Sequence, residues 1–225
     1  MSILEIKELS YFYPDGDGKR IIFDKTDISF DTSHFYAILG DSGSGKTTLL
    51  SVLAGLDKRY EGQVIYEGKE LKEIGFDKYR RSAVSMIFQS YNLIPHLSAL
   101  ENCLVAMDIS SNIQKLDKSK ILDLLASFGI DEKKAKRKVN SLSGGEQQRV
   151  AIARTILTES KIIIADEPTG NLDQNASQSI IEVFIKLAHD EGKCVIMVTH
   201  NQKLANYADT ILWIDQNKKK IKTKN

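Results

Sequence analysis

One nine-residue stretch constrains the fold more than any other part of the chain. Residues 40–48 read GDSGSGKTT and fit the pattern G-x-x-x-x-G-K-[ST]. An apolar run at 34–39 precedes this stretch, and residues 49–55 (LLSVLAG) have the composition of a helix that ends at a glycine. A strand, a glycine-rich loop and a helix in this order are the context in which the pattern forms a phosphate-binding loop.

The residue types of the loop explain how it would hold phosphate. Glycine lacks a Cβ, so the backbone can curl with its N–H groups turned inward, towards an anion at the positive end of the helix. A lysine adds charge near the β- and γ-phosphates, and a threonine hydroxyl can ligate Mg²⁺. A glycine-rich turn without a ligand would not need every motif position to be filled. We therefore predict a nucleoside triphosphate site formed by Gly40, Asp41, Ser42, Gly43, Ser44, Gly45, Lys46, Thr47 and Thr48.

Composition places few further limits on function. With 225 residues, 42% of them hydrophobic and 27% charged, the chain is long enough for a globular domain with a sizeable core. A net charge of +1 gives no support for a nucleic-acid partner. Cys103 and Cys194 lie in apolar segments, which favours buried free thiols in a reducing compartment. The sequence has neither a signal-peptide pattern nor a run of ~18 apolar residues, so a role at a membrane would require a partner.

The pattern of apolar residues changes along the chain. Residues 3–30 predict an antiparallel hairpin region, and residues 62–66 and 84–88 predict short strands. From 90 to 139 the pattern is helical, with a capping box at Ser98 and Glu101 and a second helix start at Asp117. We interpret the basic run 133–138 as a solvated helix face or loop. The lysine-rich tail 218–222 is expected to be frayed or solvated, with weak attraction to anionic lipid as the minor alternative.

A second unusual helix start lies at 142–149 (LSGGEQQR). Ser143 and Glu146 form a capping-box pattern, but glycines in the first turn of a helix cost about 1 kcal/mol each relative to alanine. An ordinary capped helix leaves Gly144 and Gly145 unexplained. An anion close to bare backbone amides would explain them, so we predict a second phosphate-binding helix N-terminus here.

Two apolar strands end in polar side chains. Residues 161–167 end in Asp166 and Glu167, and residues 194–200 end in His200. Ligands gather at the carboxyl ends of parallel strands, so Asp166 is placed to hold Mg²⁺ and Glu167 to act as general base on a water. A solvated acidic pair and a structural histidine are the alternatives. Their shared position favours contact of His200 with the γ-phosphate or its water.

Together these stretches resemble the ATP-binding-cassette (ABC) ATPases, and the resemblance covers essentially the whole chain. Residues 40–48 are similar to the Walker A loop, 162–167 to Walker B, and 142–146 to the family signature. Gln89 falls at the Q-loop, Asp173 at the D-loop and His200 at the switch histidine. Tyr13 resembles the aromatic residue that stacks on adenine, with Tyr11 as the fallback. Asp41 stands where many relatives carry proline.

The resemblance implies an α/β P-loop NTPase fold in one cassette spanning 1–225. It has a RecA-like core, an antiparallel β subdomain and an α-helical subdomain inserted at about 90–157. The cofactors are ATP and Mg²⁺, with Thr47, Gln89 and Asp166 as metal ligands, directly or through water. The implied catalytic residues are Glu167, His200, Lys46 and Gln89.

The resemblance also implies a dimer. Two cassettes pack head to tail, and each ATP lies between one Walker A loop and Ser143, Gly144 and Gly145 of the partner. Nucleotide closes this dimer and hydrolysis opens it, while Gln89 senses the γ-phosphate and Asp173 tunes the opposite site.

Residues 88–95, 98–102 and 165–173 resemble one branch of the family, the lipoprotein-release, macrolide-export and antimicrobial-peptide-resistance ATPases of bacteria. The predicted function is the ATP-hydrolysing subunit of an export or extraction system, cytoplasmic and held on the inner face of the membrane by its permease. A cell-division-type cassette that regulates a membrane partner is the alternative. A cassette acting on DNA or the ribosome is disfavoured by the short helices between Lys46 and Ser143 and the near-zero net charge.

Overall fold

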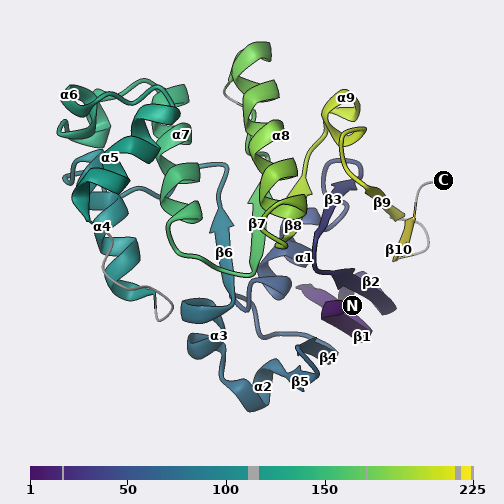
Figure 1. The fold of residues 1–225 in the computed structure, drawn as a ribbon. Coiled ribbons are helices and arrows are strands. Elements are labelled where there is room, and N and C mark those ends of the chain that lie inside the picture. The colour runs from purple at the N-terminus through teal and green to yellow at the C-terminus, as the bar shows by residue number, and fades with distance from the viewer. Residues whose placement is uncertain (17, 111–116, 171, 216–218, 224–225) are drawn as a thin grey trace.

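The computed structural model describes residues 1–16, 18–110, 117–170, 172–215 and 219–223. Within these residues the strands form two sheets, one six-stranded and mostly parallel, the other four-stranded and antiparallel. Figure 1 shows the helices of residues 99–156 at the left of the larger sheet, with the smaller sheet at the lower right, near the N-terminus. The predicted α/β fold with an antiparallel edge and a helical region is confirmed.

The larger sheet is parallel except at one edge. Its order is β10-β9-β3-β8-β7-β6, and β10 pairs antiparallel with β9. The strands are β3 (His34–Leu39), β6 (Val84–Ile87), β7 (Ile162–Asp166), β8 (Cys194–Val198), β9 (Thr210–Asp215) and β10 (Lys220–Thr223).

Both faces of this sheet are buried, which explains its continuous apolar runs. On β3, Phe35, Ala37 and Leu39 enter one hydrophobic cluster, whereas Tyr36 and Ile38 enter the other. Helix α8 (Gln174–His189) contributes to the first cluster and α1 (Lys46–Leu53) to the second. The sheet is therefore a rigid platform whose strand ends are fixed from both sides.

The smaller sheet has the order β2-β1-β4-β5. Its strands are β1 (Ser2–Asp15), β2 (Gly18–Asp31), β4 (Glu61–Tyr66) and β5 (Lys69–Glu70). The expected antiparallel hairpin is formed by β1 and β2, with several shifts of register along the pair. Helices α2 (Leu71–Ile74) and α3 (Phe76–Ser82) then lead back to β6.

The helical region lies between β6 and β7 in the chain. It contains α4 (Ala99–Ile109), α5 (Lys118–Ser127), α6 (Glu132–Ala135), the 3₁₀ turn η1 (Val139–Ser141) and α7 (Gly144–Ile156). Both predicted capping boxes are present, with Ser98 before α4 and Ser143 before α7. In the basic run, Lys133 is exposed and Lys134 pairs with Glu146 at 3.0 Å.

The described part of the lysine-rich tail is not frayed, but Lys220 and Lys222 are exposed, as the prediction of a solvated segment expected. Lys220–Thr223 forms β10, and Ile221 packs against the hydrophobic cluster of the α1 face. The carbonyl of Lys219 accepts hydrogen bonds from the Asp24 amide and the Thr26 hydroxyl. These bonds tie the segment to β2 despite its four lysines in 218–222. Residue 218 lies outside the described residues.

Both cysteines, Cys103 and Cys194, are buried and free, as predicted.

Helix α9 (Gln202–Ala205) is the short helix between β8 and β9. Among the described residues, no helix has the length and apolar character needed to cross a bilayer.

Candidate active site

The glycine-rich loop between β3 and α1 requires glycine for steric reasons. Gly43 and Gly45 have φ values of 75° and 99°, in the left-handed region. A Cβ at Gly45 would lie 2.4 Å from Ile22 Cγ2 and 3.1 Å from the Phe23 ring. Gly45 is also the N-cap of α1, and no side chain caps this helix. The first amides of α1 are therefore left to a ligand or to water.

Ser44 lies inside this loop and lacks a partner. Its side chain is buried, and its Oγ has no hydrogen-bond partner among the described residues. A Cβ at Gly40 would lie 2.7 Å from that Oγ. A buried hydroxyl without a partner costs free energy, which an anionic oxygen at the loop would offset. The loop thus fits a bound phosphate.

Lys46 extends back across the loop. Its Nζ donates hydrogen bonds to the carbonyls of Gly40 at 2.7 Å and of Asp41 at 2.8 Å. The ammonium group is thereby fixed beside the amides of the α1 N-terminus, and both features favour negative charge at the same place. The Asp41 side chain is exposed, so the residue that replaces the proline of many relatives contributes its backbone carbonyl here.

The carboxyl ends of β7 and β8 place three polar side chains beside the loop. Burial, and next the neighbouring Glu167, raise the pKa of Asp166, while Lys46 and a hydrogen bond with Thr47 oppose this shift. Glu167 Oε1 lies 3.0 Å from His200 Nδ1. Glu167 is 14% exposed and His200 is 77% exposed, so the carboxylate is shielded and the histidine faces outward. Glu167 also has a φ of 47°, in the left-handed region. Its backbone amide donates a hydrogen bond to the Val198 carbonyl, which fixes the turn against β8.

Two tyrosines of β1 have different surroundings. Tyr13 is 36% exposed, and its Oη lies 3.0 Å from Thr48 Oγ1. Tyr11 is buried and donates a hydrogen bond to Asp57 at 2.6 Å. Only Tyr13 of the two lines the cavity, so the fallback residue does not face the site.

A cavity of about 610 Å³ brings most of the predicted residues together. Its lining residues come from both sheets, the loop and the strand ends, and they are Tyr13, Arg20, Ile22, Gly40, Ser42, Gly43, Gly45, Lys46, Thr47, Thr48, Gln89, Asp166, Glu167, Gly170 and His200. Arg20, Ile22 and Gly170 were not predicted. Arg20 lies opposite Tyr13 in the β1–β2 pairing, so that register was the signal that could have revealed it.

The donor set also fits a hard divalent cation. Asp166, Thr47 and Gln89 all line the cavity and offer oxygen ligands. The described residues contain no group of three or more His, Cys, Asp and Glu side chains suited to a metal. A cation here would rest on one carboxylate, on neutral oxygens and on the phosphates of a ligand, as is typical of Mg²⁺.

Six predicted residues are not among the residues that line the cavity. Asp41 and Ser44 belong to the loop itself, whereas Ser143, Gly144, Gly145 and Asp173 lie elsewhere in the chain. Ser143 and Asp173 are exposed N-caps of α7 and α8, where their side chains accept backbone bonds. A Cβ at Gly144 would lie 3.1 Å from Tyr91 Oη. Close packing against Tyr91 is thus a local reason for a glycine at position 144. From the sequence, a bound anion was the explanation that we predicted for this glycine.

Comparisons with known proteins agree with this geometry. Residues 23–170 match the ABC transporter family. The uncharacterized ABC transporter ATP-binding protein YclH of Bacillus subtilis is 46% identical over 93% of this chain and 92% of its own length. The lipoprotein-releasing system ATP-binding protein LolD of Idiomarina loihiensis is 37% identical over 91% of this chain and 90% of its own. The macrolide export protein MacB of Mannheimia succiniciproducens is 37% identical over 95% of this chain, which spans only 33% of MacB.

Solved structures give the same result. The dimeric bacterial ABC transporter cassette MJ0796 has a TM-score of 0.89 and 32% identity, over 97% of this chain and 96% of that one. A post-hydrolysis dimer of MJ0796 bound to ADP and Pi also has a TM-score of 0.89, with 31% identity over 99% of this chain and 98% of that one. The phosphate loop, the acidic strand end, the signature helix and these relatives all agree: the chain belongs to the ATP-binding cassettes of the ABC transporter family.

Proposed function

We propose that this chain is the energy-coupling subunit of a bacterial ABC export or extraction system and works as a nucleotide-sandwich dimer. The observation that carries the proposal is the cavity in which the loop residues meet Asp166, Glu167 and His200. In this proposal residues 1–225 form one cassette, with a helical subdomain at about 90–157.

The cavity lies on one chain only, and a closed nucleotide site would need further phosphate-binding groups to cover the ligand. Helix α1 supplies bare amides to it, while the N-terminus of α7 is exposed elsewhere on the same chain. The dimers of MJ0796, whose fold this chain shares, support a dimer here. We propose that the two copies pack head to tail, so that each covers the nucleotide of the other. Ser143, Gly144 and Gly145 of the covering copy would then contact the phosphates, and Asp173 would lie near the interface.

The residues of the cavity suit hydrolysis of the terminal phosphate. Glu167 would accept the proton of the attacking water, and His200 at 3.0 Å would hold that carboxylate in place and contact the γ-phosphate. Lys46 and the α1 amides would stabilise the charge on the phosphates, and Tyr13 would stack on the base. Mg²⁺, held by Thr47, Asp166 and Gln89, would neutralise phosphate charge when bound.

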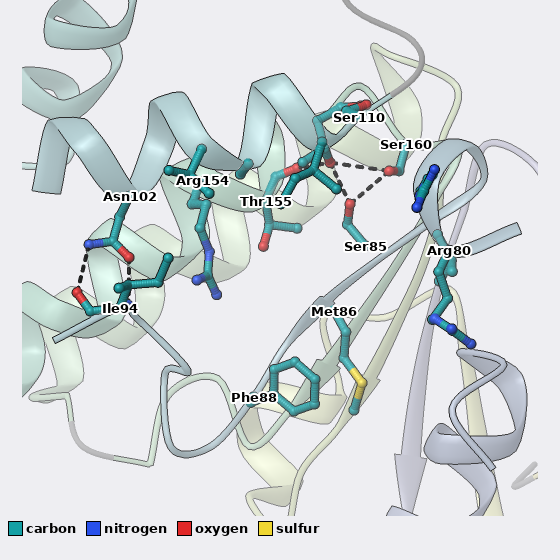
Figure 2. A pocket seen from close by; sticks show the side chains of 16 residues that line it. Arg80, Ser85, Met86, Phe88, Ile94, Asn102, Ser110, Arg154, Thr155 and Ser160 are labelled. Atoms are coloured by element: carbon teal, nitrogen blue, oxygen red, sulfur yellow. Dashed lines mark hydrogen bonds between the residues drawn. The ribbon is translucent and has the colours of Figure 1, made fainter. Parts of the chain in front are cut away.

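A permease partner would hold the chain at the inner face of the membrane. We place its contact at a second cavity of about 390 Å³ between β6, α4 and α7, shown in Figure 2. Its lining combines apolar residues such as Met86, Phe88 and Val105 with cationic Arg80 and Arg154. A permease segment with an apolar face and an acidic side chain is the occupant that this chemistry favours. Ala106→Trp, which fills the groove, should abolish co-purification with the permease partner and leave ATP binding intact.

Glu167→Gln tests the proposed chemistry. The amide cannot accept the proton, so turnover should fall at least about 100-fold while ATP still binds. ATP hydrolysis by the complex with its permease and binding of a fluorescent ATP analogue measure the two effects. Hydrolysis at the parent rate would show that Glu167 is not the base.

A further inference from the structure

We propose that Arg154 is a positioning residue that fixes the Gln89 loop to α7. Helix α7, which presents Ser143 to the nucleotide bound by the second copy, would then move together with the Gln89 loop. That loop contacts the nucleotide bound by the same chain. This inference rests on the dimer proposed above and adds a residue that couples its two sites.

The bonds of Arg154 are directed at the loop backbone. Nη1 donates to the carbonyl of Asn92 at 2.6 Å, and Nη2 donates to the carbonyl of Tyr91 at 3.0 Å. Tyr91 and Asn92 have φ values of 62° and 46°, which are uncommon for residues other than glycine. Two consecutive left-handed residues need outside support, and the forked guanidinium supplies it to both carbonyls at once.

The surroundings of Arg154 exclude a simple surface role. Burial lowers the pKa of its guanidinium, and no carboxylate of the described residues forms an ion pair with it. The side chain of Arg154 is half-buried, and its hydrogen-bond partners are neutral carbonyls. Its removal should therefore release the loop without leaving a carboxylate of the described residues unpaired. Figure 2 shows Arg154 extending from its helix into the groove, with Asn102 and Ile94 to one side.

The loop has a second anchor on the helical side. Asn102 of α4 accepts a bond from the Ile94 amide at 2.7 Å and donates to the Ile94 carbonyl at 3.2 Å. The other end of the loop follows β6, which is fixed in the sheet. Gln89 therefore lies on a short bridge between the sheet and the helices, and Arg154 holds the helical end of that bridge.

Helix α7 connects this anchor to the signature residues. Ser143 caps α7 and Arg154 lies near its other end, about 16 Å away at 1.5 Å per residue. Because a helix of this length moves as a unit, a shift at Ser143 displaces the carbonyls of Tyr91 and Asn92 as well. The neighbouring residue Gln89 would then shift relative to the chain's own Walker A loop.

Arg154→Lys in a Glu167→Gln background tests this coupling. Lysine keeps the charge but lacks the fork, so the ATP concentration for half-maximal dimerisation should rise about five- to tenfold. Binding of a fluorescent ATP analogue to the monomer should not change. In a double variant with Gln89→Ala, the effect of Arg154→Lys should disappear, because both changes act on the same loop. A merely structural role would add its full effect to that of Gln89→Ala.

Arg149→Lys is the matched control, since Arg149 lies on the same helix but lines a hollow against α8. Arg154→Gln is a second variant in case lysine is not tolerated, and thermal melting checks the folding of each. If the Glu167→Gln parent does not dimerise with ATP, the proposed nucleotide-sandwich dimer is wrong, and the coupling through Arg154 is wrong as well. If the parent dimerises and both Arg154 variants do so at the parent's ATP concentration, the coupling alone is wrong.

Discussion

Helices α1 and α7 both begin next to glycine, yet their N-termini are satisfied in different ways. At α1 the N-cap is Gly45, and no side chain caps the helix. The nearby Ser44 hydroxyl has no hydrogen-bond partner among the residues that the structure describes. At α7 the Ser143 Oγ accepts from the Glu146 amide, and Glu146 accepts from the Ser143 amide. One helix end depends on a ligand, whereas the other is stable by itself.

This difference has a functional meaning. The α1 end is enclosed in a cavity and preorganised for phosphate. The α7 end is exposed and internally capped, and because Ser143 Oγ acts there as an acceptor, its O–H can still donate to a second chain's nucleotide. In the proposed function, a site divided in this way would bind ATP on one chain and be completed by another.

The largest expected effect is at Gly45. Gly45→Ala forces a Cβ into Ile22 and a left-handed φ onto alanine, so the loop cannot keep its shape. ATP affinity should fall at least about 100-fold, measured by calorimetry on the monomer, with thermal melting to confirm folding. Gly144→Ala is the control at the other helix, because its Cβ meets only the Tyr91 hydroxyl and monomer affinity should be unchanged. Equal losses of ATP affinity in the Gly45→Ala and Gly144→Ala monomers would contradict the proposed difference between the two helix N-termini.

Ser44→Ala should have a smaller and more selective effect. The variant removes a buried hydroxyl that has no partner without ligand, so the stability of the nucleotide-free protein should stay the same or rise. ATP affinity should fall about five- to tenfold because the phosphate loses a donor. Thermal melting with and without ATP measures both quantities. A clear loss of stability without nucleotide would mean that Ser44 has a structural role.

Ser143→Ala should show the opposite pattern. Loss of the N-cap should cost about 1 kcal/mol of folding free energy, a decrease of about 2–4 °C in Tm for a chain of this size. ATP binding to the monomer should stay at the parent level. A drop in monomer affinity would show that α7 contributes to the nucleotide site of its own chain.

The smallest effect is the pH dependence of the α7 cap. The backbone amide of Ser143, and next Lys134, hold the pKa of Glu146 below its ordinary value. The carboxylate thus stabilises the fold above the unfolded pKa, and this stability is lost as pH falls through the folded pKa. The Tm difference between the parent and Glu146→Gln should be present at pH 7 and shrink below about pH 4.5. A difference that stays constant with pH would exclude this ionic contribution.

The sequence predicted the residues whose place follows from strand order. Lys46, Asp166 and His200 each follow a parallel strand, so one edge of the sheet brings them together. Residues whose place depends on the register of strand pairing were missed. Arg20 reaches the cavity through a β1–β2 pairing with shifted register, and β10 forms because β9 lies beside it.

Two other omissions have different causes. Helix α8 had a visible signal, with Asp173 as N-cap and Ile180, Phe184 and Leu187 at helical spacing, but was not predicted. The role of Arg154 depends on the left-handed conformation of Tyr91 and Asn92. Asparagine adopts that conformation more often than most residues, but tyrosine has no such preference, so the sequence does not indicate the consecutive pair.

The mass of the Glu167→Gln protein with ATP, by sedimentation, tests the divided site most directly. The account predicts twice the chain mass of 25.2 kDa with ATP and Mg²⁺, and the monomer mass without nucleotide. Adding Ser143→Arg, which places a bulky cation at the exposed α7 end, should keep the protein at 25.2 kDa while ATP still binds. Dimerisation of the Ser143→Arg variant at the parent's ATP concentration would contradict the claim that α7 of a second copy completes the site.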